Sequence, residues 1–205
     1  MNTATNTLKA AAPIAAVPNV HKRDLSTNCA ISDLRFLIPL QPGQSVCLVN
    51  PSCSLLEAFL SEPLNTIVVP EFDRIFFDNP DVDHLVFHHT PLNDLKKLIQ
   101  DVSQTLRSKG SVLFGVQNRY KQTAIHQLKA HGFDLLGVYG AWQNIDNPEY
   151  LIPLHDSKVT RYFFEHMNRP SSLKGEVFRR AAVILALVKL HFYLFRQVVI
   201  VAEKR

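Results

Sequence analysis

The stretch DHLVFHHTPLNDLKKLIQDVSQTLRSKGSVLFGV, residues 83–116, holds two short apolar runs separated by a helical pattern. Leu85-Val86-Phe87 and Ser111 to Val116 are rich in large and β-branched residues, which favours buried strands. Gly110 stands where a helix would end. A strand, a helix and a second strand predict a parallel pair with a right-handed crossover. The apolar positions of the predicted helix are Leu95, Leu98, Ile99, Val102 and Leu106.

The same alternation continues on both sides of this stretch. Short apolar runs predict further strands, and segments with helical spacing lie between them. Strands that alternate with helices predict an α/β domain with a mostly parallel sheet and helices on both faces. The further strands are expected at 45–49, 66–69, 133–139 and 198–201, and the further helices at 55–60 and 123–130.

The 205 residues fit one domain preceded by an arm. Residues 1–30 are rich in Ala, Thr, Asn and Pro without apolar periodicity, so we expect a mobile N-terminal arm and a single domain over 31–205. The 22 basic and 18 acidic residues are scattered, which argues against a nucleic-acid-binding surface. Three cysteines without CxxC spacing and the lack of a secretory signal favour a reducing, cytoplasmic location.

The most apolar stretch of the chain is 181–202. Lys189, His191 and Arg196 interrupt it, and charges near the middle of a membrane span are costly. We therefore expect a helix followed by a buried strand. Peripheral membrane contact through the aromatic residues at 192–195 is the alternative.

The order of elements and two local phrases resemble the class I, S-adenosylmethionine-dependent methyltransferase family over roughly residues 34–204. Leu106 to Leu113, LRSKGSVL, is similar to the Leu-Lys-Pro-Gly-Gly phrase before the family's fifth strand. Ala130-His131-Gly132-Phe133 is similar to the phrase that opens its sixth. The resemblance implies a Rossmann-like, mostly parallel seven-stranded sheet, with its last strand inserted antiparallel.

The chain departs from this family at the loop that holds the cofactor. In the family the first strand ends in an acidic residue and a glycine-rich turn, where backbone N–H groups approach the cofactor closely. Here the corresponding stretch is Asn50 to Ser54, NPSCS, and no glycine occurs between Gly43 and Gly110. We therefore expect either no cofactor or weakly bound S-adenosylmethionine.

Glu71 follows the second predicted strand, 21 positions after Asn50. An acid at a spacing of about 20 residues can bind ribose hydroxyls, although a solvated loop acid is the other interpretation. The short interval between Glu71 and Leu85 leaves too little chain for a crossover helix and a full strand, so the sheet is expected to be shortened there. If the cofactor site is intact, we expect Asn50, Ser52, Ser54 and Glu71 to bind the cofactor.

Three histidines lie in or just after the strand at 85–87. Positions four apart on a strand are separated by roughly 13 Å, so His84 and His88 cannot share an ion, and no metal site is predicted. His88 and His89 follow the carboxyl end of the strand, where α/β sheets bind ligands, and are the candidate catalytic residues. His89 would be a general base. The alternative is a hydrogen-bonded histidine that caps the next helix, because the sequence identifies no partner acid.

The leading hypothesis is a methyltransferase-fold protein with a degraded S-adenosylmethionine site that acts as a non-catalytic binding or assembly partner, for another protein or for a second copy of itself. The alternative is an active S-adenosylmethionine-dependent methyltransferase with a variant cofactor loop. A partner protein needs an exposed apolar patch, which we expect at Phe163-Phe164 or at Phe192 to Phe195.

Overall fold

The computed structural model describes residues 34–69, 82–90 and 95–205 apart from 147 and 169. The arm expected at 1–30 lies outside the described residues, as does Glu71. The elements are η1 (Leu34–Leu37), β1 (Ser45–Val49), α1 (Cys53–Leu60), β2 (Asn65–Val69), β3 (Val82–Phe87), α2 (Leu95–Thr105), β4 (Leu106–Gln117), η3 (Asn118–Tyr120), α3 (Lys121–Ala130), β5 (Phe133–Trp142), β6 (Tyr150–Pro153), α4 (Ser157–Tyr162), η4 (Phe163–Met167), α5 (Leu173–Leu187), η5 (His191–Leu194) and β7 (Gln197–Lys204).

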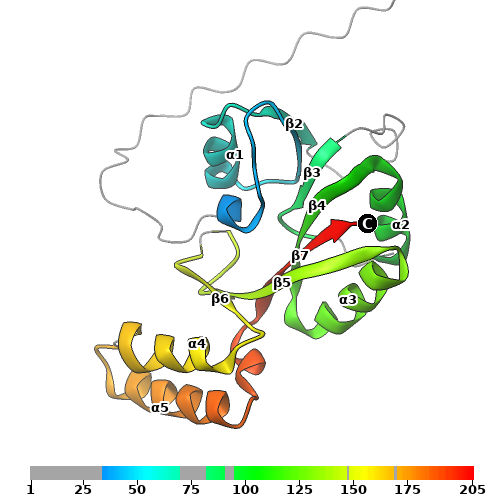
Figure 1. Ribbon diagram of the computed structural model, residues 1–205. Helices are drawn as coiled ribbons and strands as arrows, with labels where there is room; N and C mark the ends of the chain where they lie inside the picture. Colours follow the sequence, from blue (N-terminus) through cyan, green and yellow to red (C-terminus); the bar gives the residue numbers. More distant parts are fainter. Residues whose placement is uncertain (1–33, 70–81, 91–94, 147, 169) are drawn as a thin grey trace, which may run out of the picture.

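The strands form one sheet in the order β2-β1-β3-β4-β7-β5-β6 (Figure 1). β1 pairs in parallel with β2 and β3, and β3 pairs in parallel with β4. β7 runs antiparallel to both of its neighbours, β4 and β5, and β6 runs antiparallel to β5. Five of the seven strands therefore point the same way, which confirms the predicted Rossmann-like sheet with an antiparallel insertion.

Seven strands were expected from the family resemblance, but the position of one of them, β6, was not predicted. β6 follows β5 and forms one edge of the sheet, and no sequence pattern indicated a strand there. The shortened region expected between Glu71 and Leu85 falls mainly on residues 70–81, which lie outside the described part of the chain.

Helices lie on both faces of the sheet, as predicted. α2, α3 and the segment containing Phe164 pack against one face, and α1 and η1 pack against the other. An apolar core fills the space between the sheet and the helices on each face. In β1, Cys47 and Val49 pack into the core on the face covered by α2 and α3, whereas Val46 and Leu48 pack into the core on the face covered by α1. Because both faces of β1 are buried, its sequence is a continuous apolar run and does not alternate with polar residues.

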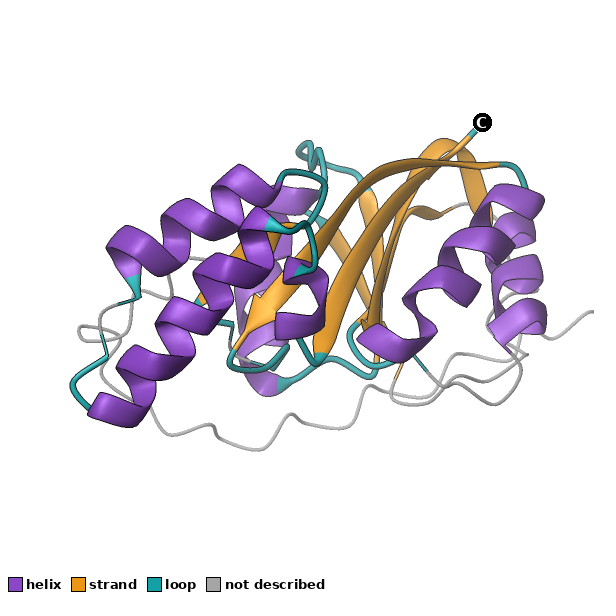
Figure 2. Ribbon diagram, turned by 90° about the horizontal axis from the view of Figure 1, so that it is seen from below, coloured by secondary structure: helices purple, strands orange, loops and turns teal. Residues whose placement is uncertain are grey.

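The region between β6 and β7 is a helical hairpin of α4 and α5, which pack side by side at one end of the molecule (Figure 2). Asp156 caps α4 by accepting a hydrogen bond from the Lys158 N–H at 2.8 Å, and Ser172 caps α5 by accepting from the Gly175 N–H at 3.1 Å. The apolar stretch 181–202 is thus a helix followed by a strand, as predicted. None of the described helices has the length and apolar character needed to cross a membrane.

Candidate functional site

The carboxyl ends of β1 and β3 lie next to each other in the parallel half of the sheet. The chain runs from β1 to β2 on one side and returns to β3 on the other, so the strand order reverses at this point. Open α/β sheets bind ligands at such a reversal, beyond the carboxyl ends of the strands. Residues 50–54, after β1, and 88–90, after β3, are called the switch-point edge below.

The loop after β1 turns without a glycine. Asn50 has a φ of 48°, in the left-handed region that asparagine tolerates better than most residues. Its N–H donates to the Val69 carbonyl at 2.8 Å, which ties the loop to β2. The Oγ of Ser52 caps α1 by accepting from the Leu55 N–H at 3.3 Å. One of the N–H groups that begin α1 is therefore already bound by a side chain of this loop.

The segment that joins β5 to β6 passes over the switch-point edge, beside α1 (Figure 1). Ser54 Oγ donates to the Asp146 carbonyl at 3.2 Å, and His88 Nε2 donates to the Ile145 carbonyl at 3.0 Å. The Ile145 N–H donates to Gln197 Oε1 at 3.0 Å. The Ile145 side chain is 1% exposed and belongs to the core beneath α1. Residues 145–146 thus bridge the start of α1, the end of β3 and the start of β7.

Asp146 is the partner acid that the sequence did not identify for the two candidate catalytic histidines. His89 Nε2 lies 2.8 Å from Asp146 Oδ1, and His88 Nδ1 lies 3.6 Å from the same oxygen. The side chains of His89 and Asp146 are 44% and 52% exposed, whereas that of His88 is 1% exposed. Burial lowers the pKa of His88, which favours a neutral ring near pH 7.

His84 has other partners. Its Nδ1 lies 2.6 Å from Ser111 Oγ, and its Nε2 lies 2.9 Å from Gln44 Oε1. Burial lowers its pKa. His84 thus contacts other groups than His88, whose Nε2 donates to the Ile145 carbonyl.

The structure brings most of the sequence-predicted site residues together. The sequence missed Ile145 and Asp146, which lie 57 positions from His88 and His89 along the chain. An isolated acid in an irregular segment gives no local signal of such a contact. The predicted residues found at the switch-point edge are Asn50, Ser52, Ser54, His88 and His89.

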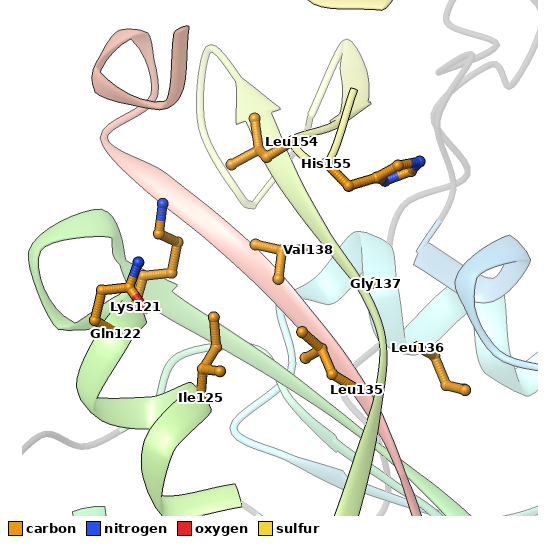
Figure 3. A pocket seen from close by; sticks show the side chains of 9 residues that line it. All are labelled: Lys121, Gln122, Ile125, Leu135, Leu136, Gly137, Val138, Leu154 and His155. Atoms are coloured by element: carbon orange, nitrogen blue, oxygen red, sulfur yellow. The ribbon is translucent and has the colours of Figure 1, made fainter. Parts of the chain in front are cut away.

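A separate pocket of about 380 Å³ lies between α3, β5 and residues 154–155 (Figure 3). Apolar side chains such as Ile125 and Leu135 line it, together with Lys121 at the start of α3. The Lys121 Nζ lies 4.5 Å from the centre of the Phe192 ring, and burial lowers the pKa of this lysine. The pocket shares no lining residue with the switch-point edge.

No family model matches the sequence, and a comparison with curated proteins found no match. Solved structures do match. An S-adenosylmethionine-dependent methyltransferase from Archaeoglobus fulgidus is 14% identical, with 83% of this chain aligned to 91% of that one and a TM-score of 0.51. This likeness shows that the chain has the class I S-adenosylmethionine-dependent methyltransferase fold.

Two other similar structures also come from methyltransferases. Geranyl diphosphate C-methyltransferase from Streptomyces coelicolor A3(2) is 11% identical, with 86% of this chain aligned to 78% of that one and a TM-score of 0.47. Precorrin-6y C5,15-methyltransferase from Geobacter metallireducens GS-15 is 14% identical, with 86% aligned to 85% and a TM-score of 0.45.

Proposed function

We propose that this chain is a methyltransferase-fold binding protein without catalytic activity, in which the segment between β5 and β6 takes the place of a cofactor at the switch-point edge. The observation that carries the proposal is the bridge made by Ile145 and Asp146 between α1 and β3. The glycine-free turn at Asn50 supports it, because side chains there replace the open backbone that a cofactor would approach.

The free energy needed to move this segment sets how strongly it would oppose a cofactor. Withdrawing a buried isoleucine such as Ile145 from a core costs about 2–4 kcal/mol. A ligand that bound only after displacing the segment would therefore lose about 30- to 800-fold in affinity. A dissociation constant of about 1 μM would become roughly 30–800 μM by this effect, and the glycine-free turn at Asn50 would weaken binding further.

Isothermal titration with S-adenosylmethionine and with S-adenosylhomocysteine tests the proposal. We expect no heat of binding up to millimolar ligand. Micromolar binding that Glu71→Ala weakens, while Glu57→Ala on the exposed side of α1 leaves it unchanged, would overturn the proposal. Asn50→Gly introduces a glycine into the turn and reports whether the loop alone limits binding.

The alternative, an active S-adenosylmethionine-dependent methyltransferase, is favoured by one contact. Asp146 orients His89 at 2.8 Å, which is the arrangement of a general base with its supporting acid. The ring of His88 is buried and bonded to Ile145, so His89 is the base in this alternative. If the titration detects the cofactor, a His89→Gln variant that binds it normally but transfers no methyl group would assign that role.

A binding protein needs a surface for its partner, and the patch expected from the sequence is wrong in part. Phe163, Phe164 and Phe195 are buried, whereas Tyr193 is exposed. The apolar surface lies instead on the outer side of α5, opposite the buried Ala182. Large apolar side chains that are exposed together on one side of a helix usually mark a surface that another molecule covers. The exposed apolar residues of α5 and its C-cap on this side, 57–89% accessible, are Leu173, Val177, Ile184, Leu187 and Val188.

Charge favours an anionic membrane surface as the partner of this outer side. Residues 155–196 contain eight Lys and Arg against three Asp and Glu, whereas the rest of the chain contains fourteen against fifteen. The positive charge of the protein is therefore concentrated in the region of the α4–α5 hairpin. Apolar residues flanked by basic ones are typical of helices that lie in the interface of anionic lipids. A second copy fits less well, since like-charged hairpins would face each other.

Co-sedimentation with phosphatidylcholine vesicles, with and without phosphatidylglycerol, tests this assignment. We expect binding only to the anionic vesicles, weakened by salt and by Ile184→Ser. Leu136→Ser, an exposed leucine in β5, is the matched control. No binding to either vesicle overturns the membrane assignment, and a stable dimer in sedimentation velocity that Ile184→Ser disrupts assigns the surface to a second copy instead.

A further inference from the structure

His88 has a buried ring nitrogen whose position needs an explanation. Its Nε2 faces the Ile145 carbonyl, which can only accept, so Nε2 carries the proton. Burial disfavours the doubly protonated ring, and Nδ1 is therefore left as an acceptor. Within the described part of the chain this buried Nδ1 has no hydrogen-bond partner. Buried polar atoms without a partner are rare and often mark an unseen water or ion.

The atom that Nδ1 faces is also an acceptor. Asp146 Oδ1 lies 3.6 Å away, beyond hydrogen-bonding distance, and a carboxylate has no proton to donate. The same oxygen is approached by His89 Nε2 at 2.8 Å. Two lone pairs directed at each other repel unless a cation or a donor lies between them. The three donor atoms of His88, His89 and Asp146 all lie within 4.8 Å of one another.

We propose that His88 Nδ1, His89 Nε2 and the Asp146 carboxylate bind a divalent transition-metal ion such as Zn²⁺. Two imidazoles and one carboxylate are ligands of zinc and of similar metals, and a fourth position stays open to water. The contact between His88 Nε2 and the Ile145 carbonyl supports this, because metal-binding histidines usually donate their other N–H to a carbonyl or a carboxylate. The sequence argument against a metal concerned His84 and did not include Asp146.

The three donor atoms must move slightly closer together to share one ion. Zinc ligands lie about 2.0–2.2 Å from the ion, so donors that share one ion lie roughly 3–4 Å apart. The side chains of His89 and Asp146 are about half exposed and can rotate to close the spacing, while the buried His88 stays fixed. An ion held in this way would clamp the β5–β6 segment onto β3. The inference does not depend on whether the protein also binds S-adenosylmethionine.

Titration of the untagged full chain with Zn²⁺, and with Co²⁺ as a spectroscopic probe, tests the proposal. We expect one Zn²⁺ per chain, a higher melting temperature with the metal, and Co²⁺ absorption bands of low coordination number. His89→Ala and Asp146→Asn change exposed residues and should each weaken binding by about tenfold or more. His88→Ala should abolish binding, but its buried position makes the two exposed variants the deciding ones.

The chain offers a matched control. His166 Nε2 lies 3.8 Å from Glu165 Oε2, so this is another exposed histidine beside an acid. His166→Ala should leave Zn²⁺ affinity unchanged. Absence of Zn²⁺ binding, or binding that His89→Ala and Asp146→Asn do not weaken, would overturn the proposal. The cofactor titration is a separate measurement, and its result would stand in either case.

Discussion

Replacing Ile145 by alanine tests whether the β5–β6 segment is built into the core or only rests on it. The side chain is 1% exposed, packs in the core beneath α1 and approaches Gly115 of β4, where a Cβ atom would collide with it. Removing three carbons from such a site leaves a cavity, because the surrounding strands relax only partly. We expect the free energy of unfolding to fall by about 2–4 kcal/mol. For a chain of this size the melting temperature should fall by about 5–15 °C.

Urea denaturation followed by circular dichroism measures the effect, with Leu136→Ala as the control. Leu136 is half exposed, so its loss should cost less than about 0.5 kcal/mol. If Ile145→Ala costs no more than this control, the segment does not contribute to the core, and the argument that it opposes a cofactor fails. Limited proteolysis of the variant should also cut near residues 143–149 sooner than in the parent protein.

Three further predictions concern other parts of the fold. In a Cys29→Ser background, a thiol reagent should modify the exposed Cys53 rapidly and Cys47 only after unfolding, because burial raises the pKa of Cys47 to about 12; rapid loss of both thiols would contradict this. Since burial lowers the pKa of His84, below about pH 6.5 the unfolded chain binds a proton that the folded chain does not. The free energy of unfolding should therefore fall from pH 7 to pH 5 in urea titrations, and it should fall less in His84→Gln. An equal fall in the two proteins would show that His84 is not the cause. Gly132→Ala should cost about 1 kcal/mol in the same assay, because φ is +84° there while the space for a Cβ is free, and an unchanged midpoint would contradict it.

Most of the sheet could be predicted because its strands and helices carry their own patterns. The helix with Leu95 and Ile99 on one side, and the apolar run within β4, needed no distant contact to be recognised. The predicted end of this helix at Gly110 was wrong, because α2 ends at Thr105 and β4 begins at Leu106. β6 carried no such pattern. It has four residues and exists as a strand because Ile152 and its neighbours pair with β5, and such pairing depends on the partner strand more than on local sequence.

Only the part of the candidate site that lies at the strand ends could be predicted from the sequence. His88 and His89 follow a strand whose carboxyl end was expected to face a ligand, and the structure places them there. The contact with Asp146 depends on how the segment after β5 folds back over β3, and nothing in the local sequence sets that path. The exposed side of α5 was missed for a different reason. Periodicity shows that a helix is apolar but does not show which side the rest of the protein covers.

The position of β7 in the sheet has a consequence for how the chain folds during its synthesis on the ribosome. In chain order β7 follows the other described strands of the sheet, yet it lies between β4 and β5. Until residues 197–204 have been synthesised, β4 and β5 share no hydrogen-bonded neighbour, and each presents an unpaired strand edge. The nascent protein therefore exposes two unpaired strand edges at once while residues 143–196 are being synthesised. That interval is when a chaperone would bind it, or when neighbouring chains would aggregate with it.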